Sequence, residues 1–174
     1  MTAMTDEQKR IRGYLQAQGA KLTPPQIVEK VRAAMTELRA AAAAVPAARF
    51  ADRPRPDDWS ANEVMAHVVE AGRHFGNAIV RVLDGQPPGA PRDAAARDTS
   101  SRPLDTWWAL LERDRAALFA RASAADPNAR LDAAIEHPFF GPLSWRETLL
   151  FMRLHDLDHA GQLQKVADAL ARAR

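Results

Sequence analysis

Apolar residues recur along most of this chain at the spacing of helices that bury one face. Four long segments carry the pattern, and their predicted limits are residues 24–45, 60–83, 101–124 and 144–171. Strand signals are nearly absent, because runs of β-branched residues are few and no stretch alternates apolar with polar positions. The pattern therefore predicts an all-α protein built as a four-helix bundle.

Three of these helices also have a recognisable start. Thr23 precedes two prolines and lies three residues before Gln26, while Ser60 and Ser144 each lie three residues before a glutamate. This spacing is the capping box, in which the two side chains satisfy backbone N–H groups at the first turn of a helix. The helix over 101–124 has a weaker start and is predicted from its apolar spacing.

Two long connections join the predicted helices. Residues 84–91 are rich in glycine and proline, and polar residues follow as far as Ser100. A connection of that length can cross the bundle, so we predict a crossover that makes the second and third long helices parallel. The other connection, residues 125–143, is too apolar for disorder. We expect it to pack over one end of the bundle.

The N-terminal part of the chain is set apart from the bundle. We expect residues 1–20 to form an N-terminal extension, with a short helix over 6–18 that Gly19 ends, and residues 21–174 to form the bundle domain. A chain of 174 residues is long enough for one domain with a sizeable core.

Composition limits the classes of function. The chain has no cysteine, so its only possible metal ligands are nitrogen and oxygen atoms. The net charge is +2 and the arginines are interleaved with acidic residues, which predicts no nucleic-acid partner. No apolar segment is long enough to span a bilayer, and no secretory signal begins the chain. We therefore expect a cytoplasmic protein with no membrane partner.

The candidate chemistry lies in three histidines. His155 and His159 are four residues apart in the helix predicted over 144–171, a spacing that places both imidazoles on one face. His67 lies in the helix predicted over 60–83. If the two helices meet, three imidazoles share one cation and leave a coordination position open, as in catalytic rather than structural sites. Each histidine also has a simpler interpretation as a hydrogen-bonded core residue.

Other polar residues near these histidines have two interpretations each. Glu63 shares a helix face with His67 and becomes a proton acceptor only if its capping box releases it. Gln162 continues the face of the C-terminal pair, either as a pocket residue or as a partner of a neighbouring helix. Asp156 and Asp158 either orient imidazoles or are surface acids.

Two further histidines are not expected to bind the same ion. His74 is seven residues beyond His67, about 10 Å along the helix axis, and is expected to be a pocket or surface residue. His137 precedes Pro138 in the second long connection, where we expect a loop residue with a satisfied ring.

The helix predicted over 144–171 is apolar on two sides. Leu150, Leu154 and Leu157 lie roughly opposite the histidine face. A helix apolar on two sides needs two partners, so we predict a homodimer, with cover by the connection 125–143 as the alternative.

In these residues the chain resembles the DinB-like superfamily, also called YfiT-like metal-dependent enzymes. The matching pieces are Trp59-Ser60-x-x-Glu63-x-x-x-His67, His137-Pro138-x-x-Gly141-x-Leu143-Ser144-x-x-Glu147 and His155-x-x-x-His159-x-x-Gln162. The resemblance extends over about residues 25–170. It implies a four-helix bundle with a crossover, often dimeric, and a divalent metal ion held by His67, His155 and His159. Characterised relatives include transferases and isomerases that use mycothiol, bacillithiol or glutathione.

The expected function is therefore that of a metal-dependent enzyme acting on a small-molecule substrate. It is either a hydrolase or a transferase that uses a low-molecular-weight thiol as cosubstrate, since the chain has no thiol of its own. A zinc, nickel, iron or manganese ion lowers the pKa of a bound water or thiol, and Glu63 is the candidate to receive the proton. Two alternatives remain open: a non-catalytic metal-binding bundle, and a structural, stress-related dimer with empty histidines.

Overall fold

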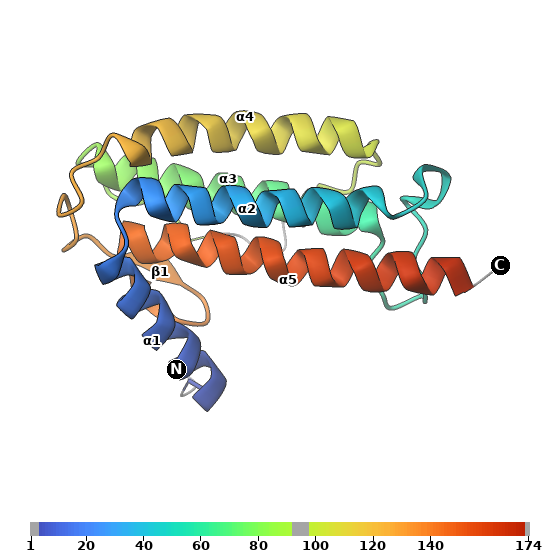
Figure 1. Ribbon diagram of the computed structural model, residues 1–174, viewed down its shortest axis with the longest axis horizontal. Coiled ribbons are helices and arrows are strands. Elements are labelled where there is room, and N and C mark those ends of the chain that lie inside the picture. Colours follow the sequence, from blue (N-terminus) through green and yellow to red (C-terminus); the bar gives the residue numbers. More distant parts are fainter. Residues whose placement is uncertain (1–3, 92–97, 173–174) are drawn as a thin grey trace.

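Four long helices lie side by side and enclose the core (Figure 1). The computed structural model describes residues 4–91 and 98–172. In these ranges the helices are α1 (Asp6–Lys21), α2 (Pro24–Ala43), α3 (Ala61–Leu83), α4 (Leu104–Ser123) and α5 (Trp145–Arg172), with a 3-10 turn at Ala47–Arg49 and two strands, β1 (Ile135–His137) and β2 (Gly141–Leu143). The four long helices agree with the sequence prediction within three residues at each end.

The predicted capping boxes are all formed. The Thr23 hydroxyl accepts from the backbone N–H of Gln26, and the Gln26 side chain accepts from the backbone of Thr23. The Ser60 and Ser144 hydroxyls make the same reciprocal arrangement with glutamates three residues later, at the starts of α3 and α5. Helix α4 follows Pro103 without a side-chain cap, in line with its weaker sequence signal.

The chain crosses the bundle between α3 and α4, as predicted. Helices α3 and α4 run in the same direction, while α2 and α5 run together in the opposite direction (Figure 1). Helix α5 packs against both α2 and α3, and α4 packs against α3 and α2. As a result α3 and α5 are antiparallel neighbours. Residues 92–97 of the predicted crossover lie outside the described part of the chain.

Helix α1 leans against α5 outside the four-helix core (Figure 1). The prediction that Gly19 ends this helix is wrong, because α1 continues to Lys21. Gly19 is buried at the crossing with α5, where a Cβ would lie 3.2 Å from Cγ of Glu147. Glycine at this position allows α1 and α5 to pack closely, and it does not end α1. Leu15 is fully buried and joins the hydrophobic core.

The second long connection contains a short antiparallel hairpin, β1–β2, that the sequence did not predict. Each strand has three residues, which is too short for an alternating pattern to be recognised. Gly141 begins β2 at φ +68°, a conformation that favours glycine. The chain leaves α4 past one end of the bundle, and the hairpin then lies along the side of α5 (Figure 1). The expected end cover is therefore only part of what this connection does.

The second apolar side of α5 is covered in part by α1. Leu150 is fully buried, whereas Leu154 and Leu157 are half-buried. Arg153 of α5 donates a hydrogen bond to the Tyr14 hydroxyl of α1 at 3.1 Å, which ties the two helices together. From the sequence, the expected cover of this side was a second subunit or the connection 125–143. Cover by α1 was not expected. The homodimer stays a prediction.

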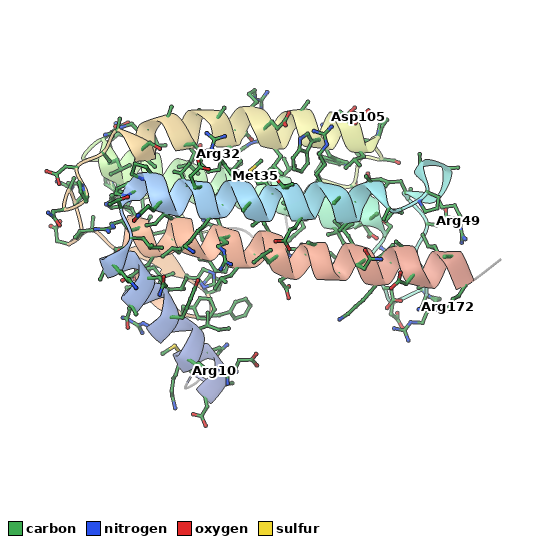
Figure 2. The ribbon with its side chains drawn as sticks, in the orientation of Figure 1. Arg10, Arg32, Met35, Arg49, Asp105 and Arg172 are labelled. Carbon is green, nitrogen blue, oxygen red and sulfur yellow. The ribbon has the colours of Figure 1, made fainter. Side chains whose placement is uncertain are left out.

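Polar side chains attach the ends of the long helices to neighbouring segments. Buried Asn62, at the start of α3, accepts from the indole Nε1 of Trp107 on α4 at 2.8 Å and donates to the carbonyl of Ser100 at 3.0 Å. At the other end of the chain, Arg49 donates to the carbonyl of Leu170 at 2.7 Å, which satisfies an oxygen in the last turn of α5. Figure 2 shows Arg49 near Arg172, at the end of the bundle where α5 stops.

An ion pair lies inside the bundle. Nη2 of Arg115 on α4 is 2.9 Å from Oδ1 of Asp156 on α5, and the two side chains are 2% and 0% exposed. Gly72 of α3 provides the room, because a Cβ there would lie 3.4 Å from Nη2 of Arg115. Burial raises the pKa of Asp156 to about 6, although Arg115 favours its ionised form. Three helices are thus joined at one buried charge pair.

Within residues 4–91 and 98–172, no helix is both long enough and apolar enough to cross a membrane.

Removal of one partner of the buried ion pair should destabilise the fold strongly. We expect Asp156→Ala to lower the free energy of unfolding by about 3–5 kcal/mol, because it leaves the Arg115 charge buried without compensation. The double variant Arg115→Met/Asp156→Leu should recover most of that loss. Urea denaturation followed by circular dichroism measures both values.

The matched control is the Arg73–Asp114 pair, which also joins two helices but is more exposed. Asp114→Ala should cost less than about 1 kcal/mol. Equal losses in Asp156→Ala and Asp114→Ala would show that the buried pair has no special role.

Candidate metal centre

The structure brings the three predicted histidines together between α3 and α5. Nε2 of His155 lies 3.1 Å from Nε2 of His67 and 3.2 Å from Nε2 of His159. The candidate ligand atoms of all three residues lie within 4.8 Å of one another. The ring centroids are 4.4 to 5.1 Å apart. His159 is 8% exposed, while the other two rings are half-buried.

Regular helix geometry explains this convergence. His67 lies about two turns after the Ser60 cap of α3, and His155 and His159 lie one turn apart on the facing side of α5. The antiparallel packing of α3 and α5 then joins residues that are 88 positions apart in the sequence. An edge-on contact with the indole of Trp59, centroids 5.3 Å apart, supports the ring of His67.

Hydrogen bonding alone does not account for the arrangement of these nitrogens. An imidazole nitrogen has either one in-plane N–H or one in-plane lone pair. Nε2 of His155 therefore makes a good hydrogen bond with only one of the two nitrogens beside it. A single cation at the centre would accept all three lone pairs. Ligands about 2.1 Å from a common ion at angles of about 90° to 110° are separated by about 3.0 to 3.4 Å. Both short separations in the cluster fall in this range.

Gln162 fixes the orientation of one ring in the cluster. Nδ1 of His159 donates to Oε1 of Gln162 at 2.8 Å, one turn further along α5. A proton on Nδ1 leaves the Nε2 lone pair of the neutral ring directed at the other two histidines. Neither sequence-based interpretation of Gln162 anticipated a bond within its own helix.

The two aspartates beside the histidines do not act alike. Asp156 is fully buried and pairs with Arg115, so its carboxylate holds the helix and does not orient an imidazole. Asp158 is exposed and lines the cavity that opens onto the cluster. The interpretation of both as surface acids is therefore wrong for Asp156.

Glu63 is held by its own helix cap and by an arginine. Its Oε2 accepts from the Ser60 backbone N–H at 2.9 Å, and its carboxylate forms an ion pair with Arg53. Burial alone raises the pKa of this carboxyl, but hydrogen bonds from Arg53 and Ser60 outweigh burial and leave the pKa below its usual range. Glu63 could accept a proton only if it left its capping box, and in the structure both hydrogen bonds of that box are formed. Its role as proton acceptor stays a prediction.

Two cavities of different character meet at His67. The smaller, of about 260 Å³, is lined mainly by polar and charged residues, among them Arg53, Ser60, Glu63 and Asp98. The larger, of about 680 Å³, lies among α1, α3, α5 and the hairpin and includes all three cluster histidines in its lining. The cluster is therefore accessible from a space that is large enough for a small molecule.

His137 lies in the wall of the larger cavity and outside the cluster. It is 5% exposed, and its Nδ1 accepts from the backbone N–H groups of Phe139 and Phe140 at 3.2 and 3.3 Å. Its predicted status as a satisfied ring is confirmed, although it belongs to a strand rather than a loop. Burial lowers the pKa of His137 to about 4, so the ring is neutral at pH 7. His74 lines the same cavity, as a pocket residue.

Sequence reasoning missed several residues that shape the site. Arg53 lies in an irregular segment without a motif, and no local signal marks Arg115 as a buried arginine. The aromatic residues of the cavity could have been predicted from the sequence, because Phe139 and Phe140 follow His137 in a connection that the sequence shows to be apolar.

A four-helix bundle with a three-histidine cluster between two of its helices defines the class of this protein. The family model of the DinB superfamily matches residues 13–163, so the chain belongs to the DinB superfamily. The match begins inside α1 and includes all three histidines. The solved crystal structure of TT2238, described as a four-helix bundle protein, is similar in fold, with a TM-score of 0.64 and 24% identity over 82% of this chain and 99% of that chain. No curated protein sequence matches the chain.

The buried ring of His137 should make stability depend on pH. A histidine whose pKa falls from 6.5 to about 4 on folding stabilises the native state above pH 6.5 and loses that contribution as the pH falls toward 4. We expect a loss of about 3 kcal/mol across this range. His137→Asn keeps an acceptor for the two N–H groups and does not titrate.

The measurement is the free energy of unfolding of the wild type and of His137→Asn, both without metal, at pH 7, 5.5 and 4. The other four histidines are common to both, so their effects cancel in the difference. A difference between wild type and His137→Asn that stays constant with pH contradicts the prediction.

Proposed function

We propose that this protein is a metal-dependent enzyme in which His67, His155 and His159 hold a divalent ion. The observation that carries the proposal is the convergence of three Nε2 atoms from two helices on one point. Zinc, nickel, iron and manganese all accept imidazole nitrogen, so the donor set fits each of them. The geometry at Gln162, which leaves a lone pair directed inward, supports the same proposal.

An enzymatic role is favoured over a purely structural metal site by the surroundings of the cluster. Structural sites are usually closed by four protein ligands, whereas the group of potential ligands found in the described residues has three members. Two of the three rings are half-buried, and the cluster borders a cavity of about 680 Å³. A substrate can therefore reach the position that the protein leaves open.

The bound ion would supply a nucleophile at neutral pH, by lowering the pKa of a coordinated water or thiol. The chain's own residues would orient the ligands, exclude bulk water and bind the substrate. Because the chain lacks cysteine, a thiol nucleophile comes from a low-molecular-weight cosubstrate. The reaction is accordingly either hydrolysis of a small molecule or transfer of such a thiol.

Glu63 fits a supporting role better than proton transfer. A general base works best with a pKa near the working pH, and hydrogen bonds hold the pKa of Glu63 below its usual range. Its ion pair with Arg53 closes one side of the polar cavity beside His67. We keep its proton-accepting role as a proposal, which requires Arg53 to move when substrate binds.

A homodimer remains part of the proposal. Leu157 keeps partly exposed apolar surface on α5, and unlike Leu154 it is not among the lining residues of the larger cavity. A second copy packed on this side would bury that surface.

Loss of any one cluster histidine should abolish tight metal binding. We expect untagged wild-type protein to contain about one divalent ion per chain, and His67→Ala, His155→Ala and His159→Ala to contain almost none, because two imidazoles alone bind weakly. Elemental analysis measures the metal content, and circular dichroism verifies folding.

His74→Ala is the matched control, since it removes a histidine from α3 that lines the cavity without joining the cluster. Near-stoichiometric metal in the three cluster variants would end the proposal. If metal stabilises the fold but the protein turns over no ester or thiol substrate, the result favours the alternative function of a non-catalytic metal-binding bundle.

Gln162→Leu should weaken metal binding without removing a ligand. The change deletes the acceptor that fixes the ring of His159, and we expect a 10- to 100-fold loss of affinity. Competition with a chelating indicator measures the dissociation constant. Gln164→Leu is the control, because Gln164 is exposed on the same helix and bonds to Asp168. Equal affinities of the two variants would contradict an orienting role for Gln162.

A further inference from the structure

One side of α5 is exposed in the second half of the helix. Helix α1 lies beside the first half of α5 only (Figure 1). Leu157, Gly161 and Lys165 follow one another at four-residue spacing along the exposed side. Leu157 is partly exposed, and a Cβ added at Gly161 would have nothing within 4 Å. A second helix could therefore approach α5 most closely at Gly161.

The charges on either side of Gly161 are self-complementary. Asp158 and Lys165 are both exposed, and along the helix axis they lie about 4.5 Å before and about 6 Å after Gly161. If two copies of α5 cross antiparallel at Gly161, Asp158 of each copy faces Lys165 of the other. In a parallel pair, like charges would face each other. The order of the charges therefore favours a second copy of this chain, in antiparallel orientation, on this side of α5.

An exposed aromatic ring lies beside α5 before Gly161, and a groove lies beside α5 after it. The ring is that of Phe139, which is 62% exposed and lines the larger cavity together with Asp158. Exposed aromatic surface of this kind is typical of an interaction site. The groove, of about 570 Å³, is large enough for a phenylalanine side chain. It lies between residues 54–59 and the last turns of α5, and its lining includes Pro54, Trp59, Val166 and Ala169.

The ring and the groove lie on the same side of α5. Asp158 lines the cavity beside Phe139, and Gln162 and Ala169 line the groove at helical spacing from it. A two-fold axis that makes two helices antiparallel reverses the direction along the helix and keeps the side. It therefore brings Phe139 of each copy to the groove of the other. Trp59, in that groove, contacts the ring of His67 with centroids 5.3 Å apart.

We propose that two copies of this chain form a two-fold dimer in which the α5 helices cross antiparallel at Gly161. Phe139 of each copy fills the groove beside Trp59 of the other. Each copy thereby supplies a side chain that packs on the residue supporting His67, and borders the larger cavity of its partner. The inference rests on the homodimer of the proposed function, whose interface it names, and it does not depend on a bound metal ion.

Sedimentation velocity on the full, untagged chain tests the interface. We expect a dimer, which Gly161→Leu weakens about 10- to 100-fold because the new side chain separates the crossing helices. Gly13→Leu is the matched control, since a Cβ at exposed Gly13 on α1 also has nothing within 4 Å. A wild type that is still monomeric at about 100 μM overturns the proposal.

The aromatic contact is tested in the same way. Phe139→Ser removes the ring that fills the partner's groove and should weaken the dimer about 10- to 100-fold. Leu131→Ser removes the other large apolar side chain that is exposed in the described residues, at 42%, and should leave the dimer unchanged. A dimer that resists both Gly161→Leu and Phe139→Ser has its interface elsewhere, which overturns the proposal.

Exchange of the two charges tests the antiparallel orientation. Asp158→Lys and Lys165→Glu each place like charges opposite each other, so each should weaken the dimer about tenfold or more. The double variant Asp158→Lys/Lys165→Glu restores opposite charges at both contacts and should dimerise about as tightly as wild type. Single variants as tight as wild type, or a double variant no tighter than the single ones, would contradict this orientation.

A cross-link gives a direct test, because the chain has no cysteine of its own. Gly161→Cys places one thiol on each copy at the crossing point, so a mild oxidant should link the two chains by a disulfide. Gly13→Cys, equally exposed, should form no such link at the same rate. Absence of faster linkage through residue 161 overturns the crossing at Gly161.

Elemental analysis of the same samples separates this inference from the proposed metal site. A wild type without metal that dimerises and responds to the variants as expected refutes the metalloenzyme and supports the interface. A wild type that holds metal as a monomer refutes the interface alone.

Discussion

The ion pair between Arg115 and Asp156 is the constraint on which the site depends, because it fixes the rotation of α5. Successive residues on a helix are about 100° apart, so turning Asp156 into the core toward α4 turns His155 toward α3, where His67 lies. Arg115 reaches Asp156 past Gly72, a position where a side chain would contact the guanidinium. A rotation of α5 large enough to separate the imidazoles would therefore break the ion pair and leave two buried charges without partners. That costs far more free energy than a shift of apolar contacts.

The histidine cluster lies where environments of different polarity meet. Behind it is the buried ion pair of Arg115 and Asp156, on one side of His67 is the smaller cavity with Arg53 and Glu63, and on the other is the larger cavity. A site at such a border can hold the polar and apolar parts of one reaction at the same time. A structural metal site has no need of either cavity, and this placement is the main physical support for the proposal that the cluster is catalytic.

The features that could be predicted from the sequence are those whose signals lie within a few residues of one another. The capping boxes at Thr23, Ser60 and Ser144 involve residues three positions apart, and they placed three helices almost to the residue. The pairing of His155 with His159 needed only helix periodicity, whereas their meeting with His67 required the family resemblance. The course of α1 over α5, the hairpin and the partner of Arg115 depend on contacts between distant segments, for which short-range patterns carry no information.

The electrostatics of the cluster follow from how its acidic neighbours are paired. Arg53 neutralises Glu63 and Arg115 neutralises Asp156, so neither carboxylate presents an uncompensated charge to the imidazoles. Asp158 is exposed, where water screens its charge. Three neutral ligands and two compensated acids would leave a divalent ion most of its charge. That charge is what lowers the pKa of a coordinated water or thiol, so two arginines outside the cluster would contribute to the chemistry by offsetting the carboxylates of Glu63 and Asp156.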